Sequence, residues 1–324
     1  MITDMELLYN VKNTVKTFPR TFLRGLGQVM FQDNMWSGLL FFIGIFWGAY
    51  SEGQAVVAWG MVVGTLVSTL TGYILQLPDK NGAQGLWGFN GSLVGCAFPT
   101  FMGDTFWMWF ALVLCAAMST WVRTGLDNVF NRWNMSTFTF PFVLSTYFFL
   151  LASRLFAAMP PEFMGSPELP NAATGVLDTS FLSLVVYWLK GISQIFLINS
   201  WVTGVFFLAA LAVNSVRAFV WAAISSAIAL ATVIIWQGPA SDIANGLYGF
   251  SAVLTGIALG AVYCNNTWRS WIWTVIGIVC TVFIQAAMNA FFAPMGLPTL
   301  TGPFCVATWL FLLPAFRFFA PAKK

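Results

Sequence analysis

Two threonines in matching surroundings are the residues best placed to do chemistry in this chain. Thr139 lies in the segment Met-Ser-Thr-Phe-Thr-Phe-Pro-Phe, and Thr301 lies 162 positions later in Leu-Pro-Thr-Leu-Thr-Gly-Pro-Phe. A hydroxyl can donate and accept a hydrogen bond, while the proline two residues later lacks an N–H and fixes φ. Neutral groups of this kind favour the binding of a neutral polar solute.

Other neutral side chains also recur, which indicates a duplicated chain. The repeated pairs, at offsets of 161 or 166, are Gln28 with Gln194, Gln76 with Gln237, Phe89 with Phe250 and Leu93 with Leu254. Polar residues kept in both halves are expected to face the pseudo-symmetric centre and line a path through it. Gln76 and Gln237 lie near predicted span ends, so we expect at most a supporting role. The alternative is that the polar side chains bond neighbouring helices, at about 1 kcal/mol each, and that the phenylalanines pack.

The composition identifies the elements that must position these residues. The chain has 324 residues, of which 59% are hydrophobic and 8% charged, and its long apolar runs show no alternation of period two. We therefore predict an all-α polytopic membrane protein. Histidine is absent and the five cysteines stand singly, so the sequence predicts no enzyme, no cofactor and no metal site. The net charge of +3 is explained by membrane orientation and calls for no nucleic acid.

Each half is expected to contain one tilted re-entrant pore helix followed by five spans. The first re-entrant segment covers residues 18–32, and its repeat surrounds Gln194. The expected spans are 36–50, 55–77, 86–102, 105–123 and 138–158, then 202–218, 219–237, 246–262, 270–289 and 299–316. The expected divisions are a leader 1–17, a first half 18–158, a linker 159–183, a second half 184–318 and a tail 319–324.

An odd number of spans per half requires the second half to enter the membrane inverted. With both termini in the cytoplasm, all but Arg154 and Lys190 of the 14 basic residues lie on the inner side. This distribution is the one that the positive-inside tendency predicts. The leader and the tail would then be cytoplasmic and the linker extracytoplasmic.

Two kinds of transport protein fit this pattern. No Asp or Glu lies well inside a predicted span, and intramembrane acids commonly couple transport to protons or cations. A passive channel is therefore favoured, and a secondary active transporter for a small polar solute is the alternative. An ammonium or water channel is disfavoured, because the chain has no histidine and no paired Asn-Pro-Ala motif.

The paired segments around Thr139 and Thr301 resemble the signature of the urea transporters, Leu-Pro-x-x-Thr-x-Pro-Phe once per half. The second copy is complete, whereas Met135 and Ser136 depart from it in the first. The Gln-Val-Met-Phe segment at 28–31 is also similar to that family, as are the Gly-Leu-Trp/Tyr-Gly-Phe segments at 85–89 and 246–250.

The resemblance covers residues from about 20 to 318 and implies a specific architecture and site. It implies a homotrimer in a lipid bilayer, with one pore per protomer, through which urea passes by a filter of phenyl-walled slots and rows of oxygen acceptors. By motif, the outer slot would use Phe31, Phe89 and Leu93, the inner slot Leu197, Phe250 and Leu254, with Thr139 and Thr301 at the middle. We expect an integral, multi-pass protein of a bacterial inner membrane.

Overall fold

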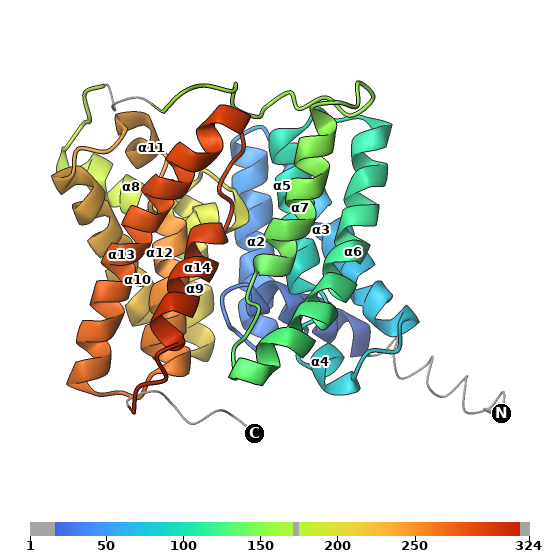
Figure 1. Ribbon diagram of the computed structural model, residues 1–324, viewed down its shortest axis with the longest axis horizontal. Helices are drawn as coiled ribbons and strands as arrows, with labels where there is room; N and C mark the ends of the chain where they lie inside the picture. The colour runs from blue at the N-terminus through green and yellow to red at the C-terminus, as the bar shows by residue number, and fades with distance from the viewer. Residues whose placement is uncertain (1–16, 171–174, 318–324) are drawn as a thin grey trace.

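The computed structural model describes residues 17–170 and 175–317, and this part of the chain is built of helices without a β-strand (Figure 1). The first half begins with a helix over residues 17–28. It continues with α2 (Met35–Ser51), α3 (Ala55–Ile74), α4 (Asp79–Ala83), α5 (Phe89–Phe101), α6 (Phe106–Phe130), η1 (Asn131–Trp133) and α7 (Phe140–Ser153). The second half contains α8 (Phe181–Ser193), η2 (Gln194–Phe196), α9 (Trp201–Asn214), α10 (Val216–Ile235), α11 (Ala240–Ala244), α12 (Gly249–Ile257), η3 (Ala258–Tyr263), α13 (Trp268–Phe292), η4 (Ala293–Met295) and α14 (Gly302–Leu312).

The two halves contain equivalent helices in the same order, and the equivalent helices run in opposite directions. The described residues of the linker, 159–170 and 175–183, lie at one face of the molecule, here called the linker face (Figure 1). α6 begins at this face, where the Thr105 hydroxyl donates to the Ala158 carbonyl. Its equivalent α13 ends there, since the Glu168 N–H bonds the Ala293 carbonyl at 3.1 Å. This is the arrangement expected of an inverted repeat.

Several helices are shorter than the spans expected from hydropathy. Only four helices of the described residues are long and apolar enough to cross a bilayer alone. α14 has 11 residues, which is about 17 Å of helix against a hydrocarbon core of about 30 Å. Within the expected spans 138–158 and 299–316, the structure instead has a turn at the left-handed residue Phe138 or Leu300, then the short helix α7 or α14, then further turns. The reason is the proline of each signature, which has no N–H and is tolerated only in the first helical turn.

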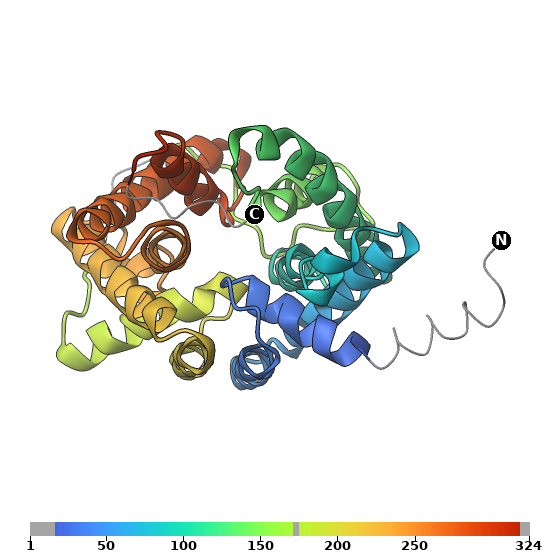
Figure 2. The same ribbon diagram turned by 90° about the horizontal axis from the view of Figure 1, so that it is seen from below.

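The re-entrant helices lie at opposite faces, the helix over 17–28 beside α4 and α8 beside α11 (Figures 1 and 2). The segment Phe181–Phe196 meets α9 at a bend of 72°. Phe31 and Leu197 form the two equivalent turns, with φ of 63° and 57°. Gly38 and Gly204 then lie directly against the carbonyls of Leu23 and Leu189, where a Cβ would overlap backbone. Each re-entrant helix therefore packs at close range against the helix that follows it.

Left-handed backbone also recurs in pairs. The equivalent residues with positive φ are Phe31 and Leu197, Gln76 and Gln237, Asn134 and Gly296, and Phe138 and Leu300. A left-handed residue that is not glycine costs roughly 1–2 kcal/mol. Keeping this strain in both halves indicates that these turns are required to break the helices at the same places.

Candidate functional site

The two signature threonines meet at the centre of the molecule. Thr139 Oγ1 lies 2.6 Å from Thr301 Oγ1, and both side chains are buried. Each threonine is the N-cap residue of its helix, α7 or α14, but neither side chain caps that helix. An N-cap hydroxyl normally accepts from an N–H of the first turn. Here the hydroxyls bond each other instead, and Cys305 Sγ lies 3.4 Å from Thr139 Oγ1.

The first turn of α7 obtains its hydrogen bond from another helix. The Phe142 N–H, the first donor after Pro141, donates to Asn90 Oδ1 of α5 at 3.2 Å. Asn90 is 1% exposed, so this bond forms in the interior. Because Asn90 of α5 bonds this N–H, the Thr139 hydroxyl does not cap α7 and instead bonds the Thr301 hydroxyl at the centre.

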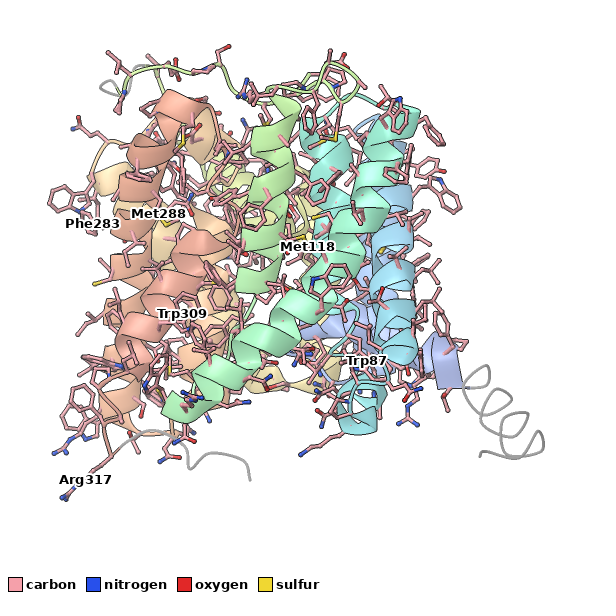
Figure 3. The ribbon with its side chains drawn as sticks, turned by 45° about the vertical axis from the view of Figure 1, so that its right-hand side comes forward. Trp87, Met118, Phe283, Met288, Trp309 and Arg317 are labelled. Atoms are coloured by element: carbon pink, nitrogen blue, oxygen red, sulfur yellow. The ribbon has the colours of Figure 1, made fainter. Side chains whose placement is uncertain are left out.

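Two equivalent hydrogen bonds join the signature segments of opposite halves. The Tyr147 hydroxyl donates to the Pro298 carbonyl at 3.0 Å, and Trp309 Nε1 donates to the Ser136 carbonyl at 2.9 Å. Trp309 lies on α14 near the contact between the halves (Figure 3). Since both acceptors are backbone carbonyls, the departure of Ser136 from the signature does not remove this contact.

A cavity of about 180 Å³ opens between the central threonines and the linker face. Four of the predicted site residues line it, namely Gln194, Leu197, Phe250 and Thr301. Leu254, the other predicted residue of this set, is fully buried and does not line the cavity. Phe101 and Phe142 supply further aromatic walls. The cavity thus combines flat apolar walls with a few neutral polar groups.

Aromatic rings occupy the equivalent place on the other side of the threonines. The Phe31 ring packs edge-on against Phe138, Tyr263 and Phe304, with centroids 6.2, 6.5 and 6.1 Å away. In the second half, leucines stand where Phe31 and Phe138 stand here, at 197 and 300. Two rings are replaced by smaller side chains, which leaves room for the cavity that Leu197 and Leu300 line on the linker side.

The predicted assignment of the two slots requires correction. Gln194 donates to the Asn245 carbonyl beside α11, on the linker face, and Gln28 donates to the Gln84 carbonyl beside α4, on the opposite face. The second-half set is therefore the linker-side set. An outer slot made of Phe31, Phe89 and Leu93 is therefore incompatible with an extracytoplasmic linker, and which set faces outward stays a prediction. The error arose because the motifs do not show at which face a re-entrant helix enters.

The predicted glutamines differ in their positions. Gln28 and Gln194 each donate their amide to a carbonyl, at 2.8 and 2.9 Å, so they anchor the re-entrant helices. Gln76 and Gln237 are exposed in left-handed turns that end α3 and α10. The structure does not place this second pair at the path. Both glutamines adopt the same left-handed conformation, with φ of 51° and 52°, at equivalent helix ends.

Two further triads of side chains were missed from the sequence, and the second of them lines the linker-side cavity. In the first half, Arg123 contacts Asp127 at 3.3 Å, and Thr137 donates to Asp127 at 2.6 Å. In the second half, the equivalent residues are Gln285, Asn289 and Thr299, and Gln285 Nε2 donates to the other two at 3.0 and 2.5 Å. The common offset of 162 could have revealed them, but the residue types differ between the halves.

The first triad also contacts the predicted slot. Arg123 Nη1 donates to the Leu86 carbonyl at 2.6 Å, and its guanidinium lies 5.5 Å from the centroid of the Phe89 ring. Leu93, one turn further along α5, is fully buried. Arg123 therefore holds the start of α5 and one wall of the first-half slot in place.

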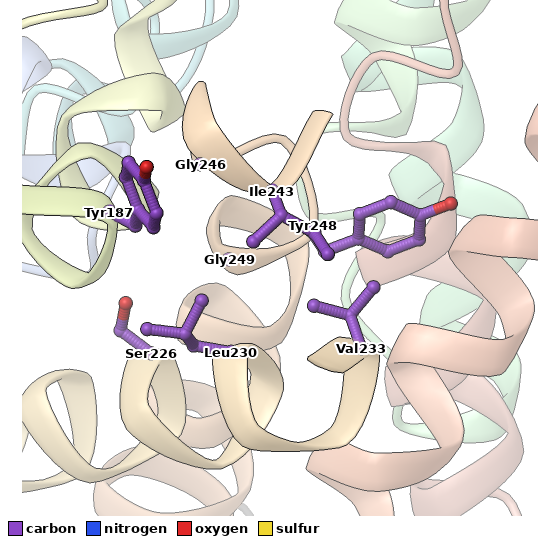
Figure 4. Close-up of a pocket in the computed structure, with 8 residues that line it drawn as sticks. All are labelled: Tyr187, Ser226, Leu230, Val233, Ile243, Gly246, Tyr248 and Gly249. Atoms are coloured by element: carbon purple, nitrogen blue, oxygen red, sulfur yellow. The ribbon is translucent and has the colours of Figure 1, made fainter. Parts of the chain in front are cut away.

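A second cavity, of about 10 Å³, lies between α8, α10 and α12 (Figure 4). Tyr187, Ser226 and Tyr248 are among its lining residues. A cavity needs roughly 10–15 Å³ to hold one water. This space is a packing gap of the second half and is too small for a solute.

The fold and site define a polytopic α-helical membrane protein in which a buried pair of threonine hydroxyls lies beside an aromatic-walled cavity. The family model described as "Urea transporter" matches residues 20–316. The chain is 32% identical over 301 residues to urea transporter 1 of Ovis aries, which covers 90% of this chain and 75% of that protein. It is 32% identical over 311 residues to urea transporter 1 of Rattus norvegicus, covering 93% and 78%. The chain belongs to the urea transporter family, whose members are transporters and not enzymes.

Proposed function

We propose that this protein conducts urea passively across the membrane. The observation that carries the proposal is the hydroxyl pair of Thr139 and Thr301, which is buried between an aromatic cluster and an aromatic-walled cavity. Urea is planar, neutral and rich in N–H donors. A dry path that removes its water must offer fixed acceptors, or lose several kcal/mol per unpaired group. No enzymatic step, cofactor or metal is needed for this function.

The pore, the oligomeric state, the orientation and the location belong to the same proposal. We propose that the two halves, 18–158 and 184–318, form one pore per protomer, and that protomers assemble as a homotrimer. The distribution of basic residues supports cytoplasmic termini and an extracytoplasmic linker. A bacterial inner membrane is the proposed location.

The function is tested by stopped-flow urea flux into proteoliposomes, with and without imposed Na⁺ or H⁺ gradients. We expect urea to equilibrate down its gradient at a rate that does not respond to either ion. Accumulation of urea against its gradient, driven by an ion, would instead identify a secondary active transporter.

The central hydroxyls supply a mutational prediction. Thr139→Val and Thr301→Val keep the side-chain shape but remove a hydrogen bond worth about 0.5–1.5 kcal/mol net. If passage of the centre limits the rate, urea permeability falls roughly 2- to 13-fold per site. The measurement is stopped-flow flux per reconstituted protein, with elution volume and melting temperature as controls. Wild-type flux in both well-folded variants would show that the hydroxyls only pack.

A further inference from the structure

Four side chains that line the linker-side cavity have equivalents that all carry an aromatic ring. Inversion relates the two sides of the central threonines, so these equivalents occupy the space that corresponds to the cavity on the side away from the linker. The equivalent pairs are Phe101 with Tyr263, Phe142 with Phe304, Leu197 with Phe31, and Leu300 with Phe138.

The pairing of Phe101 with Tyr263 depends on one additional residue in the second half. α5 and α12 match at an offset of 161, whereas Thr105 and Thr267, whose side chains cap α6 and α13, match at an offset of 162. The additional residue is accommodated by η3, a π-helical segment that ends at Tyr263. A hydrogen-bonded π-turn holds one residue more than an α-turn. Tyr263 therefore ends its helix in the second half as Phe101 ends α5 in the first.

Phe138 lies in the middle of the four rings. Its ring centroid is 5.2 Å from that of Phe304, 5.8 Å from that of Tyr263 and 6.2 Å from that of Phe31. The side chain is 4% exposed. Phe138 and its equivalent Leu300 have the same left-handed backbone, with φ of 50° and 49°. The two sides of the central threonines therefore differ here by the side chain alone, a ring on one side and an isobutyl group on the other.

We propose that Phe138 sets the upper size limit for solutes, at a constriction on the side of the path away from the linker. The constriction consists of the rings of Phe31, Phe138, Tyr263 and Phe304. A solute that fits the linker-side cavity of about 180 Å³ still has to pass these rings. The paired signature leaves position 138 open, since it is the second of the two variable residues before the threonine. This inference rests on the proposed function, because it concerns the same path.

The two sides of such a path act as resistances in series, so the narrower side determines the permeability. Removing bulk from the wider side then has little effect, whereas removing it from the constriction raises the permeability. The rise is larger for a solute that carries one methyl group more than urea, because a close-packed cluster does not yield freely to added volume. The ratio of the two permeabilities therefore reports where the size limit lies, and a loss of active protein cancels in it.

The experiment compares wild type with Phe138→Leu, which places at 138 the side chain found at 300. Stopped-flow measurements in proteoliposomes give the permeabilities of urea and of N-methylurea. We expect the ratio of N-methylurea to urea to rise about 10-fold or more, since one extra methylene in a tight apolar site is discriminated roughly 10- to 200-fold. The matched control is Leu300→Ala, which removes bulk from the wider side and should keep the wild-type ratio. An unchanged ratio in Phe138→Leu, or an equal rise in Leu300→Ala, overturns the proposal.

A second variant keeps the test decisive if Phe138→Leu does not fold. Tyr263→Leu removes another ring of the same constriction, so the ratio should rise in the same direction. Tyr263→Phe keeps the ring and should keep the wild-type ratio. A wild-type ratio in well-folded Tyr263→Leu overturns the constriction while urea flux persists. Absence of urea flux in the wild-type protein would instead reject the proposed function.

Discussion

Gly95→Ala is expected to destabilise the protein strongly. Gly95 of α5 lies against the backbone of Gly60 in α3, and Gly64 lies in the same way against Gly91. A Cβ at position 95 would overlap the Gly60 carbonyl and crowd the backbone of Met61. Neither obstacle is a side chain that can rotate away, so α3 and α5 must separate. In membranes, such close contacts replace the hydrophobic effect as the force that joins helices.

The expected cost is at or above the upper end of the roughly 1–3 kcal/mol typical of overpacking. Thermal melting in detergent, followed by size-exclusion chromatography, measures it. Gly125→Ala is the matched control, because Gly125 lies within α6 with no neighbour near its Cβ position. This second change should be neutral or stabilise by up to about 1 kcal/mol, since alanine favours helix. Equal melting temperatures for the two variants would contradict the packing argument.

Arg123→Gln is expected to cost more stability than the double variant Arg123→Gln with Asp127→Asn. The side chains of Arg123 and Asp127 are only 14% and 25% exposed. Removing one partner of a fully buried ion pair costs about 3–5 kcal/mol, because the other charge is left uncompensated, and a smaller cost of the same sign is expected for this partly buried pair. The double change creates the Gln–Asn pair that the second half already contains at 285 and 289, so part of the loss should return.

A double-mutant cycle on melting free energies measures this coupling. Asp127→Asn completes the cycle, and Thr137 remains to bond the amide oxygen. We expect the double variant to be more stable than the sum of the single changes predicts, by about 1 kcal/mol or more, which is typical of residues in contact. Simple additivity would show that Arg123 and Asp127 act independently. The double change should not restore the contact between position 123 and the Phe89 ring, because glutamine has no guanidinium to place over the ring.

The sequence predicted the central pair because inversion brings equivalent residues near the pseudo-symmetric axis together. Thr139 and Thr301 meet for this reason. Selecting residues that are identical in both halves also selected Gln76 and Gln237, which lie in equivalent backbone turns and not at the centre. It missed Gln285, because its equivalent is Arg123 and the two halves have diverged there. Hydropathy, in turn, could not distinguish a full span from a short helix with turns at its ends, since both are equally apolar.

The N-termini of α7 and α14, which meet at the central threonines, also disfavour cations there. Both helices begin at the bonded pair of threonines, and each helix N-terminus carries about half a positive charge. Two such ends raise the local potential, which repels ammonium, sodium and hydronium ions but attracts the carbonyl oxygen of urea. Every elementary charge that leaks dissipates about 2.3 kcal/mol per 100 mV of membrane potential. If this centre conducts urea as proposed, the two helix ends would limit the leak of cations through it.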